Sequence, residues 1–96
     1  MTYTFHPEAE EEFNHTIDYY ETIEVGLGYD FALEVNTAIQ RSVQLPNAWT
    51  TLDDNIRRSL VHRFPYGILY SVEGDELFII AIMNLHRDPD YWRNRR

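Results

Sequence analysis

Hydrophobic side chains in residues 7–45 repeat with the period of an α-helix, at spacings of three or four in two stretches. The positions are Ala9, Phe13, Ile17 and Tyr20 in the first stretch, and Phe31, Ala32, Val35, Ala38, Ile39 and Val43 in the second. Pro7 suits the first turn of a helix, and Gly26 stops the first pattern. The sequence predicts one helix from Pro7 up to Gly26 and a second from about Tyr29 to Leu45, packed as an antiparallel pair.

The remaining segments show the shorter period of β-strands. Residues 3–6 alternate briefly, "RRSLVHRF" alternates from Arg57, and "YGILYSV" follows Pro65. The stretch "LFIIAIM" comes after the turn "EGDE" and completes a hairpin. Its apolar residues, Leu77–Met83, occupy both odd and even positions, whose side chains point to opposite faces of a strand. We therefore expect this strand to be central and covered on both faces.

The order of these elements defines the expected fold class. Residues 46–56 show no period and are expected to form a loop, which Trp49 holds against the body. A short helical turn is expected to begin at Pro89. We predict a single α+β domain over residues 1–96, of order β-α-α-β-β-β, with the helix pair packed on one face of a small antiparallel or mixed sheet.

Composition excludes several kinds of site. The chain contains no cysteine, which excludes disulfides and thiolate metal sites within it. The histidines show neither HxxxH nor HxH spacing, and there is no glycine-rich phosphate loop, so we expect no metal and no cofactor. The first residues lack the basic and apolar regions of a signal peptide, and the longest apolar run is too short to span a bilayer. No membrane partner is expected.

Charge is divided unevenly along the chain. Residues 1–56 carry eleven Asp or Glu and one Arg, a balance of −10, whereas residues 57–96 carry five Asp or Glu and seven Arg, a balance of +2. All eight basic residues are arginine, which forms planar two-pronged contacts with phosphate and carboxylate groups. Such charge either keeps a surface soluble or marks a binding site, and composition alone leaves both open.

The arginines of the second half flank the last predicted strands. Arg57, Arg58 and Arg63 precede the hairpin, and Arg87, Arg93, Arg95 and Arg96 follow it, beside Tyr91 and Trp92. Because neighbouring strands lie about 5 Å apart, we expect the two groups to form one cationic patch beside the sheet, opposite the acidic helices. Strand alternation is expected to turn Arg57 and Arg63 to one face, and Arg58 and His62 to the other.

A patch of this kind has a direct use in nucleic-acid recognition. Guanidinium groups hold phosphates, aromatic rings stack on bases, and His86 could transfer protons near neutral pH. The alternative is structural. In that case Arg87 pairs with Asp88 or Asp90, Trp92 closes the core, and the last two arginines extend into water.

The stretch "RRSLVHRFPYGILYSVEGDELFIIAIMNLHRDPDYWRNR" resembles the C-terminal half of the RelE/ParE toxin superfamily, most densely at "RFPYGILY" and "HRDPDYW". The N-terminal "FHPEAEEEF" resembles the opening of the same family, in which a strand runs into a helix with acidic first residues. The resemblance implies the cytoplasmic toxin of a type II toxin–antitoxin pair, held silent by a cognate antitoxin in a hetero-oligomer.

The resemblance also separates two possible activities. RelE-like members cut mRNA on the ribosome, whereas ParE-like members poison DNA gyrase. Gly67 stands where the RNA-cutting members carry a catalytic arginine, and their basic residues on the preceding strand are matched only in part, by Arg58. Glycine cannot stabilise a charged transition state. The acidic first half also suits a protein target better than RNA. We therefore favour a ParE-like toxin that is not itself an enzyme.

Two alternatives stay open. In an mRNA endonuclease, Arg87 and Tyr91 would correspond to the family's C-terminal arginine and tyrosine. Arg87 would hold the scissile phosphate, Arg63 would supply the missing charge, and Tyr91 or His86 would assist proton transfer. In the other alternative, the chain is an inactive homologue that still binds antitoxin.

The resemblance implies two binding surfaces. The residues expected to contact the target or the antitoxin are Arg57, Arg58, Arg63, Arg87, Tyr91, Trp92, Arg93 and Arg95. The antitoxin is expected to lay a helix in a hydrophobic groove by the helix pair and to add a strand at a free sheet edge.

Overall fold

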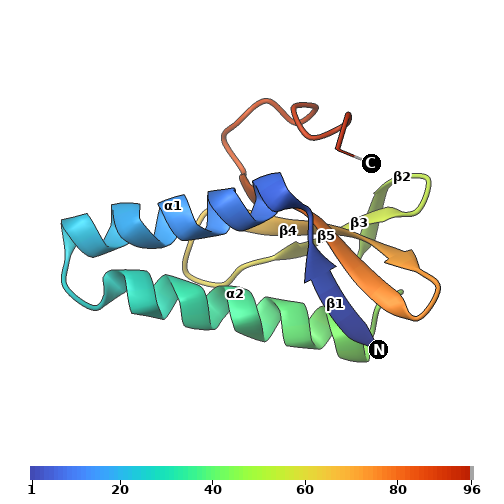
Figure 1. The fold of residues 1–96 in the computed structure, drawn as a ribbon, viewed down its shortest axis with the longest axis horizontal. Helices are drawn as coiled ribbons and strands as arrows, with labels where there is room; N and C mark the ends of the chain where they lie inside the picture. Colours follow the sequence, from blue (N-terminus) through green and yellow to red (C-terminus); the bar gives the residue numbers. More distant parts are fainter. Residues whose placement is uncertain (96) are drawn as a thin grey trace.

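The computed structural model describes residues 1–95, and Arg96 lies outside the described residues (Figure 1). The elements are β1 (Thr2–Phe5), α1 (Pro7–Ile23), α2 (Leu27–Gln44), β2 (Thr50–Asp53), β3 (Ile56–Leu60), β4 (Tyr66–Glu73) and β5 (Glu76–Asn84). The strands form one mixed sheet of order β1-β5-β4-β3-β2, in which β1 runs parallel to β5 and the other pairs are antiparallel. The predicted α+β fold class is confirmed.

Local hydrogen bonds fix the ends of both helices. The imidazole Nδ1 of His6 accepts a bond of 3.0 Å from the Glu8 backbone N–H, which caps α1. Gly26 has a φ of 90°, a conformation that glycine adopts without strain. The Glu21 carboxylate accepts bonds from the N–H groups of Gly26 (2.9 Å) and Gly28 (3.0 Å). One side chain of α1 therefore holds the first turn of α2 and closes the predicted hairpin.

The sheet is covered on both faces, as the apolar pattern of Leu77–Met83 predicts. Helices α1 and α2 pack on one face, where Phe31, Val35 and Ile39 are fully buried against residues of β4 and β5. The C-terminal segment, defined as residues 85–95, folds back beyond the end of β5 (Figure 1). It covers the other face, and its Trp92 packs there against residues of β3, β4 and β5. Strand β5 lies between β1 and β4, inside the sheet.

One additional strand and one shortened strand differ from the sequence prediction, and the other elements shift by a few residues at their ends. The expected loop at residues 46–56 contains β2, which pairs with β3 through Thr50 and Arg58. Strand β2 is a short edge strand with the sequence TTLD, and four residues are too few to show a period. Strand β3 ends at Leu60 instead of continuing to Phe64. The chain turns there into Pro65, which has no N–H for a sheet ladder.

The residues after Asp88 form consecutive turns. The N–H of Arg93 bonds to the carbonyl of Asp90 (3.2 Å), and the N–H of Arg95 bonds to the carbonyl of Trp92 (3.0 Å). These three-residue spacings are those of a tight helical turn. They place Trp92 under the segment, 1% exposed, and leave Arg93 on its outer side.

Candidate functional site

The last arginine described, Arg95, is buried in an ion pair with α1. Its guanidinium donates two bonds of 2.9 Å to the two carboxylate oxygens of Glu12, and it lies 3.6 Å from Glu8. Only 8% of the Arg95 side chain is exposed. Burial by itself would lower the pKa of Arg95, but the Glu12 hydrogen bonds and charge raise it overall. Arg95 is therefore a fixed structural cation.

The same pair completes the edge of β5. The register of β1 ends where Phe5 pairs with Ile79, because the chain then turns into α1. Beyond that point, the Ile82 N–H donates to Glu12 Oε1 (3.0 Å) and the Ile80 carbonyl accepts from Arg95 (3.2 Å). The side chains of Glu12 and Arg95 thus take over hydrogen bonds that a longer β1 would make to β5. They satisfy backbone groups of β5, because a buried backbone group without a partner is costly.

The ring of Tyr91 lies close to two guanidinium groups. The Cζ of Arg87 is 3.9 Å from the centre of the Tyr91 ring, and the Cζ of Arg95 is 4.9 Å from it. Arg87 also lies 3.9 Å from the Glu12 carboxylate. The Tyr91 hydroxyl is buried beside Glu12 without a well-formed hydrogen bond. Burial, followed by the interaction with Glu12, raises the pKa of Tyr91. Near neutral pH the phenol keeps its proton, so Tyr91 is unsuited to act as a general base.

The other residues of the C-terminal segment divide between surface and core. Arg93 bonds to Asp53 of β2 (2.5 Å) and to Asp90 (2.6 Å) on the protein surface. Trp92 is enclosed in the core, which leaves it no free face for a target. His86 is exposed, and its backbone N–H bonds to the Asn84 side chain (2.9 Å).

The arginines before the hairpin also have separate partners. Arg57 donates to the carbonyl of Trp49 (2.7 Å). Arg63 has a φ of 72° and lies 3.5 Å from Asp30 and 3.9 Å from Glu34 of α2. Both therefore lie on the helix side of the sheet, as expected from alternation, although Arg63 is in a loop and not on the strand.

Arg58 is different because its guanidinium makes neither a hydrogen bond nor an ion pair with any other side chain or backbone group among residues 1–95. A Cβ added at Gly67 would lie 3.1 Å from Arg58 Cγ and 3.2 Å from Cδ, so the stem of Arg58 fills the space over that glycine. The Arg58 side chain lines a cavity of about 320 Å³, which we call the cationic cavity. Its lining comes from three segments and comprises Arg41, Ala48, Trp49, Thr50, Arg58, Leu60 and His62. Strand alternation predicts that Arg58 and His62 lie on the same side of the chain, and both line this cavity. Arg41 comes from α2, and no pattern in the sequence indicates that it joins them.

The predicted single patch of arginines is wrong. Within the described chain, Arg63 is held by α2, Arg87 and Arg95 by α1, and Arg93 by β2. The acidic helices therefore pair with the arginines instead of lying opposite them. The structural alternative is right for Trp92. Arg87 does not pair with Asp88 or Asp90 but with Glu12, and Arg95 is buried instead of extending into water.

The end of the helix hairpin exposes a group of large apolar side chains. We call this surface the hairpin patch, and its members are Tyr19, Ile23, Val25, Tyr29 and Leu33, exposed by 59%, 57%, 90%, 66% and 47%. Tyr19 and Ile23 are one turn apart on α1, and Tyr29 and Leu33 are one turn apart on α2. Exposed apolar side chains gathered at one end of a domain are candidates for a surface that binds other proteins.

A solved chain described as "Chromosomal ParDE TA system from P. aeruginosa" has a similar fold. The TM-score is 0.78 at 17% sequence identity, and the match covers 90% of this chain and 97% of that chain. No protein-family model and no curated protein sequence matches the chain. The fold expected from the RelE/ParE resemblance is therefore confirmed.

Two further findings concern the described residues. No cluster of three or more His, Asp or Glu side chains within residues 1–95 is arranged to hold a metal ion. In that same range, neither helix is both long enough and apolar enough to cross a membrane.

Proposed function

We propose that the chain is the toxin of a type II toxin–antitoxin pair and that it is ParE-like. It arrests growth in the cytoplasm by binding a protein target, DNA gyrase, and a cognate antitoxin silences it in a hetero-oligomer. The observation that carries this proposal is the fold, which matches a chain of a ParDE system over 90% of its length. The motifs "RFPYGILY" and "HRDPDYW" support the same assignment.

The candidate catalytic groups favour binding over cleavage. Arg87 is paired with Glu12, and the raised pKa of Tyr91 keeps its phenol protonated. Arg63 points to α2, and the stem of Arg58 occupies the space at Gly67. RNA cleavage needs a base and a cation that converge on one phosphate. Tyr91 contacts Arg87 but keeps its proton, and Arg58 and Arg63 are engaged with other elements of the described chain.

Two surfaces suit the antitoxin. The hairpin patch can accept the apolar face of a helix, and Asp18, Glu21 and Glu24 around it favour a helix with basic flanking residues. Strand β2 is at the edge of the sheet, next to β3 only, so its outer side can pair with an added strand. A tail that reaches both surfaces would hold the toxin in two places.

Controlled expression tests the assignment. Production of the chain alone should stop growth, and co-production of the protein from the adjacent gene should restore it. The two proteins should also elute as one complex from a sizing column. Uninterrupted growth with the folded chain present would overturn the toxin assignment and would leave the inactive antitoxin-binding homologue as the explanation.

The cationic cavity supports a second candidate, an mRNA endonuclease. Arg58 has no carboxylate partner in the described chain, and His62 lies in the same cavity. An arginine and a histidine beside Trp49 could hold and cleave a phosphodiester. Primer extension on translated messages decides between the two candidates. Cuts that require ribosomes and disappear in Arg58→Ala would establish the endonuclease.

A further inference from the structure

The tip of the β4–β5 hairpin concentrates negative charge without a cation. Glu73 of β4 pairs directly with Glu76 of β5, and Asp75 lies in the turn between them. Like charges opposite each other on neighbouring strands destabilise the pair. None of these three carboxylates has an arginine partner among the described residues. The Glu73 carboxylate accepts a bond of 3.4 Å from Asn55, and Glu76 accepts one of 3.0 Å from Thr4.

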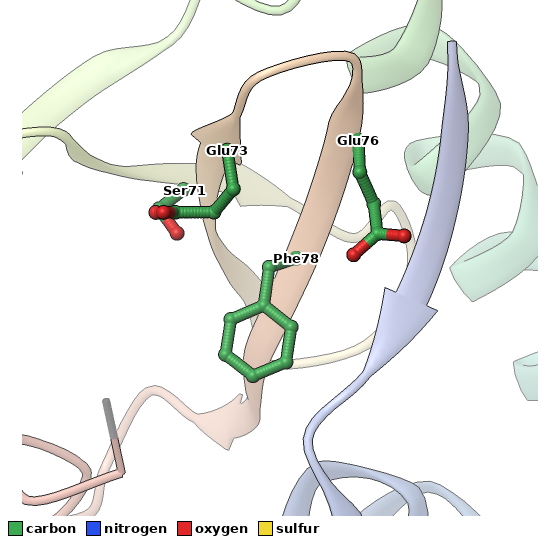
Figure 2. Close-up of a pocket in the computed structure, with 4 residues that line it drawn as sticks. All are labelled: Ser71, Glu73, Glu76 and Phe78. Carbon is green, nitrogen blue, oxygen red and sulfur yellow. The ribbon is translucent and has the colours of Figure 1, made fainter.

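A cavity of about 310 Å³ opens beside this tip. Ser71 and Glu73 of β4 and Glu76 and Phe78 of β5 line it, on the sheet face away from the helices (Figure 2). Ser71 is 1% exposed, and its Oγ is buried with no hydrogen-bond partner in the described chain. A buried hydroxyl without a partner is destabilising. The cavity therefore combines two carboxylates that have no cationic partner among the described residues with a buried hydroxyl that has no hydrogen-bond partner there.

The fourth lining residue, Phe78, indicates which class of ligand fits the cavity. Phe78 is half-buried, and its ring lies below and between the carboxylates of Glu73 and Glu76, which point to opposite sides (Figure 2). An aromatic face attracts a planar organic cation and offers no ligand to a metal ion. No group of three or more His, Asp or Glu side chains among residues 1–95 is placed to hold a metal ion, and the lining of this cavity contains two carboxylates. A guanidinium group can stack on the ring and donate in a fork to carboxylate oxygens, whereas an ammonium group acts as a point charge.

We propose that this cavity is a binding site for an arginine side chain presented by a partner protein. The guanidinium stacks on Phe78 and donates to the carboxylates of Glu73 and Glu76. It also donates an N–H to Ser71 Oγ. The site lies on the sheet, away from the hairpin patch, and it goes beyond the proposed function because it requires neither toxicity nor gyrase.

Nuclear magnetic resonance titration of the full chain tests the site. The probe is N-acetyl-L-arginine amide, which has no charged termini, and the matched control is the uncharged N-acetyl-L-citrulline amide. We expect saturable shifts of the Ser71, Glu76 and Phe78 amides with the arginine probe and none with citrulline. Free L-arginine carries its own carboxylate and should bind more weakly. Tighter binding of free arginine would show a small-molecule site and overturn the proposal.

Variants distinguish binding in the cavity from nonspecific attraction to negative charge at the hairpin tip. Glu73→Gln and Glu76→Gln should each weaken binding of the arginine probe about tenfold, because each removes one charge-assisted bond. Asp75→Asn removes the same charge from the same tip but does not line the cavity, so it should leave binding nearly unchanged. Ser71→Ala should weaken binding by a smaller factor. Equal losses in Asp75→Asn and Glu76→Gln, with dispersed spectra in both, would reduce the effect to unspecific charge and overturn the proposal.

Discussion

Glu12 and Arg95 form a two-pronged ion pair across 83 positions of sequence, with both bonds at 2.9 Å. The pair joins α1 to the C-terminal segment and, through the backbone of Ile80 and Ile82, to the uncovered edge of β5. It therefore holds together three elements that the chain order separates. The arginine-rich C-terminal segment, which the sequence suggests is a binding surface, thus stabilises the fold through Arg95.

Breaking this pair should strongly destabilise the fold. Arg95→Gln removes the two-pronged partner of Glu12 and leaves its carboxylate only the Ile82 N–H and Arg87 at 3.9 Å. The Arg95 and Glu12 side chains are only 8% and 15% exposed. Removing one member of a buried pair costs about 3 kcal/mol or more. Urea unfolding followed by circular dichroism measures the loss. Arg93→Gln is the control, since its partners are at the surface, where ion pairs contribute little. Equal losses for both variants would contradict the role given to Glu12 and Arg95.

Trp92 should act on stability rather than on target recognition. It is 1% exposed and fills the core between the sheet and the C-terminal segment. Trp92→Ala should lower the free energy of unfolding by about 3–5 kcal/mol. Trp92→Phe keeps most of the volume and should lose less. If Trp92→Ala abolished target binding at full stability, Trp92 would instead be a contact residue.

Burial of Tyr91 should make the fold less stable at alkaline pH. Folding raises its pKa above the unfolded value of 10.0, so the folded state holds this proton more tightly. The resulting stability is fully present below pH 10 and is lost as pH rises toward the folded pKa. Burial also raises the pKa of Tyr20 and Tyr70, so the comparison must isolate Tyr91. The free energy of unfolding should fall less steeply with rising pH in Tyr91→Phe than in the natural chain. Parallel curves would contradict this prediction.

Gly67 and Arg58 should be energetically coupled. An added methyl group at position 67 meets the Arg58 stem at 3.1–3.2 Å, so Gly67→Ala forces that stem to move. Overpacking of this kind costs about 1–3 kcal/mol, and the flexible stem should keep the loss near the lower limit. Arg58→Ala opens the space, so the double variant should lose less than the two single losses added together. A double-mutant cycle measures this coupling, and strict additivity would contradict the contact.

The hairpin patch should decide antitoxin affinity. Tyr29→Glu adds a charge to a surface that must lose water on binding, and it should weaken the complex with the adjacent gene product tenfold or more, as for a central contact residue. Leu45→Glu is the matched control, because Leu45 is exposed to a similar extent, 60% against 66%, at the other end of α2. Titration calorimetry gives both affinities. Equal weakening by the two variants would place the antitoxin elsewhere.

The elements with long periodic patterns were predictable from the sequence. The stripe from Phe31 to Val43 specifies α2, and the apolar run Leu77–Met83 specifies an inner strand. Strand β2 was not predictable, because its four residues gain their structure from pairing with β3. Local pattern carries information about a segment's own burial but not about which distant backbone it meets.

The site was predicted less well than the fold for a related reason. The motif "HRDPDYW" indicates the family fold, but the partner of Arg87 and Arg95 is Glu12, far away in the chain. Charge counting suggested that acidic helices and basic strands would separate, whereas opposite charges at the packed surfaces pair with one another. Only the packing of α1 against β5 brings Glu12 to the C-terminal segment.

We propose that the chain acts by binding gyrase and not by cutting RNA. One parallel assay tests it: the purified chain is added to gyrase with relaxed plasmid and to ribosomes translating a defined message. We expect supercoiling to fall with increasing chain concentration while primer extension shows an intact message. Unimpaired supercoiling together with ribosome-dependent cuts in the message would contradict the claim.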